Sequence, residues 1–260
     1  DLTEWIKLND RIKNPKQTFK IAIAGKYTDL SDAYISVVES LKHAGYTHSA
    51  KIDIKWIASD ECVNDEETKK ILQDVDALVV PGGFGVRGIE GKLNAIKYAR
   101  ENNLPFLGLC LGMQCAVIEF ARHVVGLENA NSTEFNEGTP YPVIDLMTEQ
   151  KHIEGYGATM RLGQFECRVL KGSKAHQAYG KDVIFERHRH RYEVNNEYKQ
   201  MIADKGLVFS GVSPDGMLCE MIEYPKNDWF VACQFHPEFK SRPEHPHPLF
   251  QGLIDAVAQR

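Results

Sequence analysis

The fold is decided by the stretch LPFLGLCLGMQCAVIEFAR, residues 104–122. Residues 104–109 form a short apolar run that is typical of a buried strand, and residues 112–122 have the apolar spacing of a helix. Gly108 and Gly112 stand on either side of the junction, where the chain has to turn sharply. We therefore expect a strand that passes directly into a helix, as in α/β proteins.

The same alternation continues toward the N-terminus. Apolar, β-favouring runs are followed by segments with helical spacing, and this order predicts βαβ units. Strands in such units form a parallel sheet that helices cover on both faces. The predicted strands span residues 19–25, 51–57 and 76–80, and the predicted helices span residues 31–44, 65–73 and 93–99.

After about residue 129 the sequence is richer in strands. Helices are predicted there near residues 196–203 and at the end of the chain. The fold class that we predict is α/β: a doubly wound, mostly parallel sheet with helices on both faces and added antiparallel strands. The predicted strands of this half span residues 159–170, 183–194, 207–212, 218–223 and 230–235.

The start of the chain differs from the rest. Residues 1–18 are polar and charged, with Asn14-Pro15 as a breaker, and we interpret them as a linker or tail from a preceding domain. Residues 19–260 are predicted to form one domain. Because the chain begins with Asp1 and its first residues are charged, we expect a piece of a longer chain without a signal peptide.

Composition excludes several classes of protein. The 260 residues hold 31 Lys and Arg against 36 Asp and Glu, so the net charge is 31 − 36 = −5, which argues against a partner that is a nucleic acid or an anionic membrane. No apolar run approaches the roughly 20 residues that cross a bilayer. Six cysteines without a CxxC pair are sparse for a disulfide scaffold, which predicts a reducing, cytoplasmic location.

Cys110 is the candidate nucleophile. It is the central residue of Gly108-Leu109-Cys110-Leu111-Gly112, the Gly-x-nucleophile-x-Gly pattern with Cys in place of Ser. The predicted helix begins directly after Cys110, and the positive end of a helix dipole favours a thiolate. The N–H of Leu111 would face an oxyanion formed on attack. The alternative is a buried cysteine in a tight strand–helix turn.

His236 is the candidate base. It follows the apolar strand predicted at 230–235, at the edge where open α/β sheets place their sites. Glu238 is two residues further on and could orient the imidazole through its second nitrogen. The alternative is a histidine in a proline-containing surface turn. A Cys, a His and a Glu at strand ends together are what nucleophilic attack on an amide or ester needs.

Two glycine-rich segments and one charged segment have competing interpretations. Residues 83–88 match GxGxxG, the pattern of a dinucleotide-binding loop. That pattern needs an acidic residue at the end of the next strand to bind a ribose, and none is present there. A loop whose backbone N–H groups bind an oxyanion is therefore the better interpretation. Residues 20–27 fail the P-loop pattern at Lys20 and Tyr27.

In ERHRHRYEV, residues 186–194, alternation places the arginines on one face of the predicted strand and the histidines on the other. The segment could form a solvated strand face, a metal site that lacks a third ligand, or a site where an arginine binds an anion.

These residues resemble a known family. PGGFG, GLCLGMQ and HPE occur in the order found in class I glutamine amidotransferases of the triad type, and the resemblance is closer still to the glutaminase domains of CTP synthases. It covers nearly the whole chain from about residue 19. The further motifs that carry it are GKYTDLSDAYISVVESL (25–41), PGGFGVRGIEGK (81–92), STEF (132–135), TMRLG (159–163), ERHRHRYEVN (186–195) and FHPEFKSRP (235–243).

The resemblance implies a flavodoxin-like fold and a role for each matched residue. Cys110 would be the nucleophile, His236 the general base and Glu238 the residue that orients it. An oxyanion hole would come from the N–H groups of Gly83 and Leu111. The residues that would surround the glutamine are Gly83, Phe84, Leu111, Gly112, Met113, Gln114, Glu134, Arg191 and Tyr192.

The resemblance also implies partners. The chain would hydrolyse L-glutamine to glutamate and ammonia, for an N-terminal synthetase domain of the same polypeptide that aminates UTP to CTP. ATP and Mg²⁺ would bind to that domain, GTP would activate the full enzyme, and the full enzyme would be a homotetramer. We expect neither a cofactor nor a metal in this chain.

Two other functions fit the same motifs. One is another thiol hydrolase or peptidase on this fold, and the other is a non-catalytic regulatory module that binds a small ligand. An electrophile that mimics glutamine distinguishes a glutaminase from both alternatives. A glutaminase should react with it, whereas neither a peptidase nor a module with a dead site is expected to react.

Overall fold

A computed structural model describes residues 1–26, 31–83, 87–146 and 160–260 of the chain. Its centre is a nine-stranded sheet of order β2-β1-β3-β4-β12-β11-β10-β7-β8. The strands from β2 to β12 in this order run parallel, and the strands that follow are antiparallel to their neighbours. This confirms the predicted fold class of a mostly parallel sheet with added antiparallel strands. The strands are β1 (Gln17–Gly25), β2 (Ala50–Ala58), β3 (Ala77–Val80), β4 (Phe106–Leu109), β7 (Arg161–Val169), β8 (Val183–His190), β10 (Val208–Val212), β11 (Cys219–Glu223) and β12 (Phe230–Cys233).

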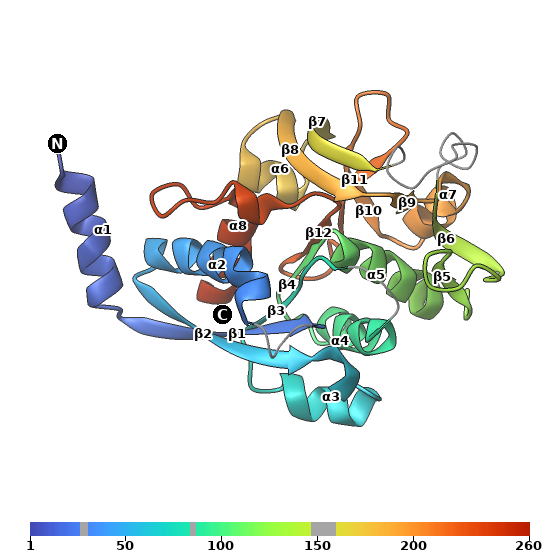
Figure 1. Ribbon diagram of the computed structural model, residues 1–260, viewed down its shortest axis with the longest axis horizontal. Helices are drawn as coiled ribbons and strands as arrows, with labels where there is room; N and C mark the ends of the chain where they lie inside the picture. The colour runs from blue at the N-terminus through green and yellow to red at the C-terminus, as the bar shows by residue number, and fades with distance from the viewer. Residues whose placement is uncertain (27–30, 84–86, 147–159) are drawn as a thin grey trace.

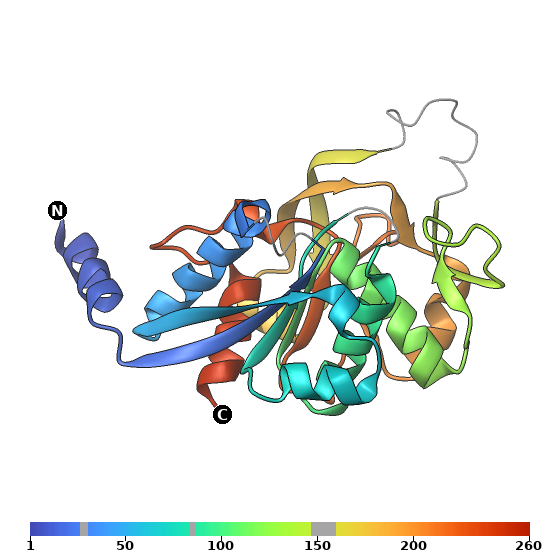
Figure 2. The same ribbon diagram turned by 60° about the horizontal axis from the view of Figure 1, so that its bottom comes forward.

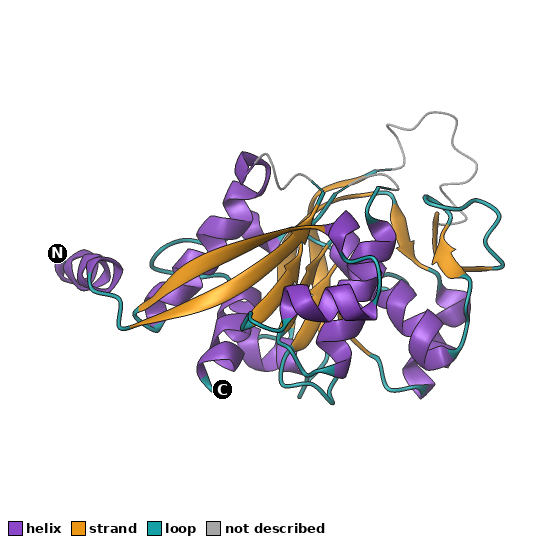
Figure 3. Ribbon diagram, turned by 90° about the horizontal axis from the view of Figure 1, so that it is seen from below, coloured by secondary structure: helices purple, strands orange, loops and turns teal. Residues whose placement is uncertain are grey.

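Helices cover both faces of this sheet, as Figure 3 shows from below. One face packs against α3, α4 and α5, and the other packs against α2, α6 and α8. Full burial of an apolar side chain such as Leu93 on α4 contributes about 1.5–3 kcal/mol, so each helix is held mainly by its apolar face. The helices are α2 (Ile35–Thr47), α3 (Asp65–Leu72), α4 (Ile89–Glu101), α5 (Leu111–Phe120), α6 (Lys174–Tyr179), α7 (Asn196–Asp204) and α8 (Pro248–Ala258), with short helical turns at Ser31–Tyr34, Ser59–Glu61, Ala121–Val125 and Pro237–Phe239.

The predicted strand at 183–194 is two strands. β8 pairs with β7 at the edge of the large sheet, and β9 (Tyr192–Val194) pairs with β6 in a separate sheet. The chain changes sheets at Arg191, so a single strand was the wrong interpretation of this segment. The second sheet has the order β5-β6-β9, with β5 (Ala130–Ser132) and β6 (Tyr141–Leu146), and it packs against α5 (Figure 1).

The first residues form a helix, α1 (Thr3–Lys13), within the segment that we interpreted as a linker or tail. It contacts α2 and β2, and both Figures 1 and 2 show it at one end of the molecule, beside the start of β1. Leu8 is its buried residue, whereas Trp5 and Ile6 are 52% and 66% exposed. The assignment of residues 1–18 to a linker and of residues 19–260 to one domain stays a prediction.

Candidate active site

Cys110 and His236 follow two neighbouring parallel strands. β4 and β12 are paired, with Leu109 opposite Cys233, so the residues after them leave the sheet at the same edge. Gly82, which follows β3, lies between them: a Cβ atom added there would be 2.9 Å from His236 Cε1 and 3.5 Å from Cys110 Cβ. The two side chains that the sequence predicted at strand ends are therefore brought together.

The turn at Cys110 is strained and tightly packed. Cys110 has φ 50° and ψ −101°, a backbone conformation that costs a non-glycine residue about 1–3 kcal/mol. Its N–H donates to Cys233 O at 2.7 Å, which fixes the turn to β12. At Gly112 a Cβ atom would lie 2.1 Å from Val80 O, so only glycine lets α5 begin this close to the sheet. The strain and the close packing place the Cys110 side chain at the N-terminus of α5.

The imidazole of His236 is held from its Nδ1 side. Nδ1 lies 2.8 Å from Glu238 Oε1, and the backbone N–H of His236 donates to Arg187 O at 2.8 Å. Burial opposes a charge on this ring, but hydrogen bonds to Cys110 and to Glu238 outweigh it and raise the pKa of His236 to about 10. Because Nδ1 faces the carboxylate, Nε2 is the nitrogen left for the sulfur. A cationic imidazole there stabilises negative charge on Sγ.

The predicted oxyanion-hole residues are neighbours. A Cβ atom on Gly83 would lie 3.4 Å from Leu111 Cδ2, and Leu111 is the first residue of α5, where backbone N–H groups have no partner within the helix. A cavity of about 210 Å³ opens beside them, and its lining includes Gly82, Gly83, Cys110 and His236. Phe84, also predicted to contact the glutamine, lies outside the described residues.

The predicted residues on α5 are buried. Met113 is fully buried in the hydrophobic cluster on that face of the sheet, and Gln114 is 3% exposed. Among the described residues that line the cavity beside Cys110, neither these two nor Gly112 occurs. Direct contact of Gly112, Met113 and Gln114 with a substrate stays a prediction.

Gln234 is a site residue that the sequence analysis missed. It directly follows β12 within the mainly apolar run 230–235, it is fully buried, and its Nε2 lies 3.6 Å from Cys110 Sγ. Gln114 Nε2 donates to Gln234 Oε1 at 3.2 Å and to Tyr192 O at 3.1 Å. A polar residue inside an apolar run was the available signal, because a buried amide needs partners.

The other predicted glutamine-binding residues lie in or directly beside the small sheet. Glu134 lies in the turn after β5, and its N–H donates to Ser132 Oγ at 3.1 Å. Arg191 lies in the bend between β8 and β9, and Tyr192 is the first residue of β9. β9 pairs with β6, and β6 pairs with β5. Because α5 packs against all three strands, the small sheet holds these residues near the helix that follows Cys110.

The alternation in residues 186–194 separates two environments. Arg187 and Arg189 are exposed, whereas His188 and His190 are each 2% exposed, so a solvated face was the right interpretation for these arginines and the wrong one for the histidines. The described ranges contain no group of three or more His, Cys, Asp or Glu residues arranged to hold a metal ion. All six cysteines are buried and free, as expected for core residues.

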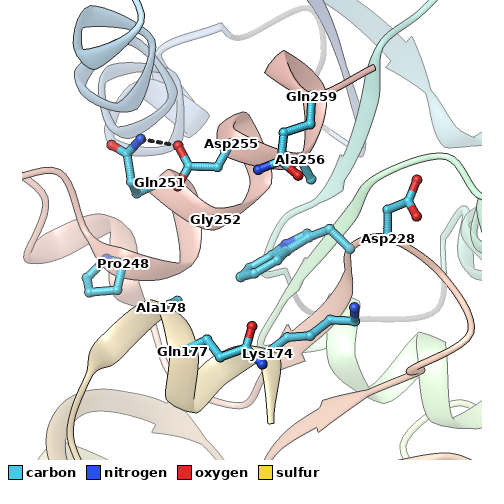
Figure 4. A pocket seen from close by; sticks show the side chains of 11 residues that line it. Lys174, Gln177, Ala178, Asp228, Pro248, Gln251, Gly252, Asp255, Ala256 and Gln259 are labelled. Atoms are coloured by element: carbon cyan, nitrogen blue, oxygen red, sulfur yellow. Dashed lines mark hydrogen bonds between the residues drawn. The ribbon is translucent and has the colours of Figure 1, made fainter. Parts of the chain in front are cut away.

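A second cavity, of about 400 Å³, lies between α6 and α8 (Figure 4). Asp228 and Trp229 on its wall precede β12, whereas His236 follows that strand, so this cavity lies at the opposite end of β12. Its one acid on α8, Asp255, is already 2.7 Å from His48 Nε2 and 2.6 Å from Gln251 Nε2.

Comparison with known proteins agrees with this geometry. The model of the family "Glutamine amidotransferase class-I" matches residues 29–256. The chain belongs to the class I glutamine amidotransferases. The CTP synthase of Caldanaerobacter subterraneus subsp. tengcongensis is 57% identical over 257 residues, which are 99% of this chain and 48% of that protein. The chain thus spans about half the length of the curated relatives that it matches.

Solved structures support the same assignment. The glutaminase domain of the Trypanosoma brucei CTPS with bound acivicin has a TM-score of 0.87 and 39% identity, and the match covers 93% of this chain and 94% of that one. A putative GMP synthase protein from Thermoplasma acidophilum, 18% identical with a TM-score of 0.59, shares the fold. The resemblance to class I amidotransferases, and to the glutaminase domains of CTP synthases, is confirmed. No helix in the described ranges is both long and apolar enough to cross a membrane.

Proposed function

We propose that this chain hydrolyses L-glutamine to glutamate and ammonia through the triad Cys110, His236 and Glu238. The observation that supports it most directly is the placement of a strained cysteine and a carboxylate-bound histidine on either side of Gly82. Family membership supplies the substrate class, because class I amidotransferases use glutamine.

The reaction takes two steps. Sγ of Cys110 attacks the side-chain amide carbon of glutamine, and the N–H groups of Gly83 and Leu111 bind the oxyanion. When the C–N bond breaks, His236 gives its proton to the departing ammonia, which leaves a γ-glutamyl thioester. A water molecule then loses a proton to the neutral imidazole and attacks the thioester carbon. The C–S bond breaks, glutamate leaves, and Cys110 and His236 return to their starting state.

Glu134 and Arg191 are proposed to hold the α-carbon groups of the substrate. The ammonium of glutamine needs an acidic partner, and Glu134 offers one; the carboxylate suits the fork of the Arg191 guanidinium. Phe84, Gly112, Met113, Gln114 and Tyr192 complete the proposed binding residues.

Glutamate release by the wild-type chain and its cysteine variants tests this function. Cys110→Ser is expected to abolish activity, and the matched variant Cys62→Ser is expected to keep it, since burial raises the pKa of the Cys62 thiol to about 11 and makes it unreactive. A glutamine-like electrophile should add one adduct at Cys110 by mass spectrometry. No adduct and no glutamate would favour the non-catalytic module, and cleavage of peptides without glutamine turnover would favour a peptidase.

The complete enzyme is proposed to be a CTP synthase that uses the ammonia to aminate UTP, with ATP and Mg²⁺ on a synthetase domain N-terminal to this one and GTP as activator. The described residues contain no group of three or more His, Cys, Asp or Glu arranged to hold a metal ion, and the P-loop pattern fails at Lys20 and Tyr27. This chain, given UTP, ATP, Mg²⁺ and ammonium, should therefore form no CTP that chromatography detects. Detectable CTP would contradict the division of labour between domains.

The exposed apolar side chains of α1 fit the proposed connection to another domain. Trp5 and Ile6 are more than half exposed, and contact with a synthetase domain would remove them from water. A homotetramer of the full enzyme and a cytoplasmic location remain predictions from the sequence.

A further inference from the structure

A buried polar cluster lies behind the segment that carries Arg191. Its members are Arg161 on β7, His188 and His190 on β8, Glu193 on β9 and Glu220 on β11. The side chains of the four residues other than Arg161 are 2% exposed or less, and that of Arg161 is 12% exposed. A buried polar cluster lowers stability unless each donor faces an acceptor. The donor and acceptor roles within the cluster can therefore be deduced from its contacts.

The directions follow from one carbonyl group. Tyr192 O can only accept, so His190 Nδ1, 3.2 Å away, must donate its proton to it. His190 Nε2 is then an acceptor in the neutral ring, and His188 Nδ1 at 2.9 Å must donate to it. That leaves His188 Nε2 without a proton. It lies 3.4 Å from Glu220 Oε2, and both of these buried atoms are without a hydrogen-bond partner among the described residues.

Neutral histidines fit this chain of donors. Burial, together with the charge of Arg161, lowers the pKa of His188 to about 2 and that of His190 to about 3, so neither ring is charged at pH 7. Burial raises the pKa of the Glu220 carboxyl, against the opposing effect of Arg161. Burial also raises the pKa of the Glu193 carboxyl, to about 8, against the opposing effect of Arg161. His236 is the other titratable group that faces the cluster.

The charge balance also places one proton on a carboxyl group. Arg161 is always cationic and lies 2.9 Å from Glu220 Oε1 and 3.3 Å from Glu193 Oε1. One carboxylate neutralises it, and a second would leave an uncompensated buried charge. Burial raises the pKa of both carboxyls, so the contacts decide between them. Glu193 Oε1 lies 3.4 Å from His190 Nδ1, which carries a proton, whereas the free Oε2 of Glu220 faces the unprotonated Nε2 of His188.

We propose that Glu220 is protonated and donates a hydrogen bond to His188 Nε2, which fixes both histidines in the Nδ1–H form and holds the Tyr192 end of the turn that carries Arg191. Tyr192 O then receives His190 Nδ1 from one side and Gln114 Nε2 from the other, so the turn is tied to α5 beside Cys110. Glu220 and His188 are positioning residues, since they act on the substrate through Arg191. This step rests on the proposed glutaminase function.

Histidine tautomers provide the first test. In the ¹⁵N-histidine-labelled chain at pH 7, long-range ¹H–¹⁵N spectra should show His188 and His190 neutral with the proton on Nδ1, assigned through the single variants His188→Asn and His190→Asn. Glu220→Gln should leave both tautomers unchanged, because its amide still donates to Nε2. An imidazolium at His188, or an Nε2–H form at His190, overturns the proposal. This measurement needs no substrate, so it decides the inference even if no glutamine is turned over.

Kinetics provide the second test. Glu220→Met removes the donor and should raise the KM for glutamine about tenfold, with a smaller change in kcat. Glu220→Gln should restore the wild-type KM, since it keeps a donor for His188 and an oxygen for Arg161. The matched control is Glu223→Met on the same strand: Glu223 is 3% exposed but binds the N-terminal N–H groups of α6. Equal KM values for Glu220→Met and wild type, or equal rises in both Glu220 variants, contradict the assigned donor.

Discussion

Gly82→Ala should strongly reduce glutaminase activity although Gly82 takes no part in the chemistry. The added Cβ atom would lie 2.9 Å from His236 Cε1, whereas an ordinary contact begins near 3.4 Å. The imidazole must therefore retreat by 3.4 − 2.9 = 0.5 Å. It has little freedom to do so, because Nδ1 is bound to Glu238 at 2.8 Å and the backbone N–H of His236 is bound to Arg187 O.

The size of the effect follows from this displacement. A misplacement of about 1 Å costs a catalytic arrangement about 10²-fold in rate, so half of that predicts a loss of about tenfold in kcat. The KM for glutamine should change less, because the atoms nearest to the new methyl group belong to His236 and Cys110, not to Glu134 or Arg191.

The assay compares kcat for glutamate release in Gly82→Ala with that in Gly138→Ala. A Cβ atom on Gly138 meets only Asn136 Oδ1 at 3.7 Å, an ordinary contact, so this control introduces the same change without a displacement. Thermal unfolding of both variants checks that the fold is kept. Wild-type kcat in a folded Gly82→Ala chain would refute the placement of His236 against this glycine.

Three further predictions concern the same site. His236→Ala should lower kcat by about 10²–10⁴-fold and Glu238→Ala by less, since water or packing can partly replace an orienting group. Single-turnover rates of the variants that equal the wild-type rate would reject the triad. Arg191→Lys should raise the KM for glutamine more than it lowers kcat, because an ammonium lacks the fork geometry, and an unchanged KM would exclude a role in binding the α-carboxylate. The pKa of His236 is raised from 6.5 to about 10, so its stabilising contribution is complete below about pH 6.5 and is lost as the pH rises toward 10. The difference in unfolding free energy between wild type and His236→Ala should therefore shrink over that range in denaturant titrations, and a difference that grows would contradict the raised pKa.

The sequence predicted the parallel part of the fold and the meeting of Cys110 with His236 for one physical reason. Each residue follows a mainly apolar run, and runs of this kind are buried parallel strands whose carboxyl ends share an edge. The glycines around Cys110 were also a signal visible in the sequence, because close packing excludes a side chain there: a Cβ atom at Gly112 would lie 2.1 Å from Val80 O.

The parts that could not be predicted depend on long-range pairing. Strands of three residues such as β5 and β9 are too short to show a period, so the small sheet was not foreseen. In residues 186–190 of β8 both faces are polar, and alternation alone does not say which one is buried. The pairing of β8 with β7 turns His188 and His190 inward, where Arg161 and Glu220 from other strands meet them.

The division between the two sheets has a functional consequence. The nucleophile and its base depend on β4 and β12 of the large sheet, whereas Glu134 and Arg191 depend on the small one. The side chain of Gln114 joins the two, because it donates both to Gln234 beside Cys110 and to the Tyr192 carbonyl beside Arg191. Substitutions that disturb the small sheet should therefore act mainly on KM, and those at the ends of β4 and β12 mainly on kcat. Gln114 is the residue at which both constants should change together, since its amide connects the turn that carries Cys110 with the turn that carries Arg191.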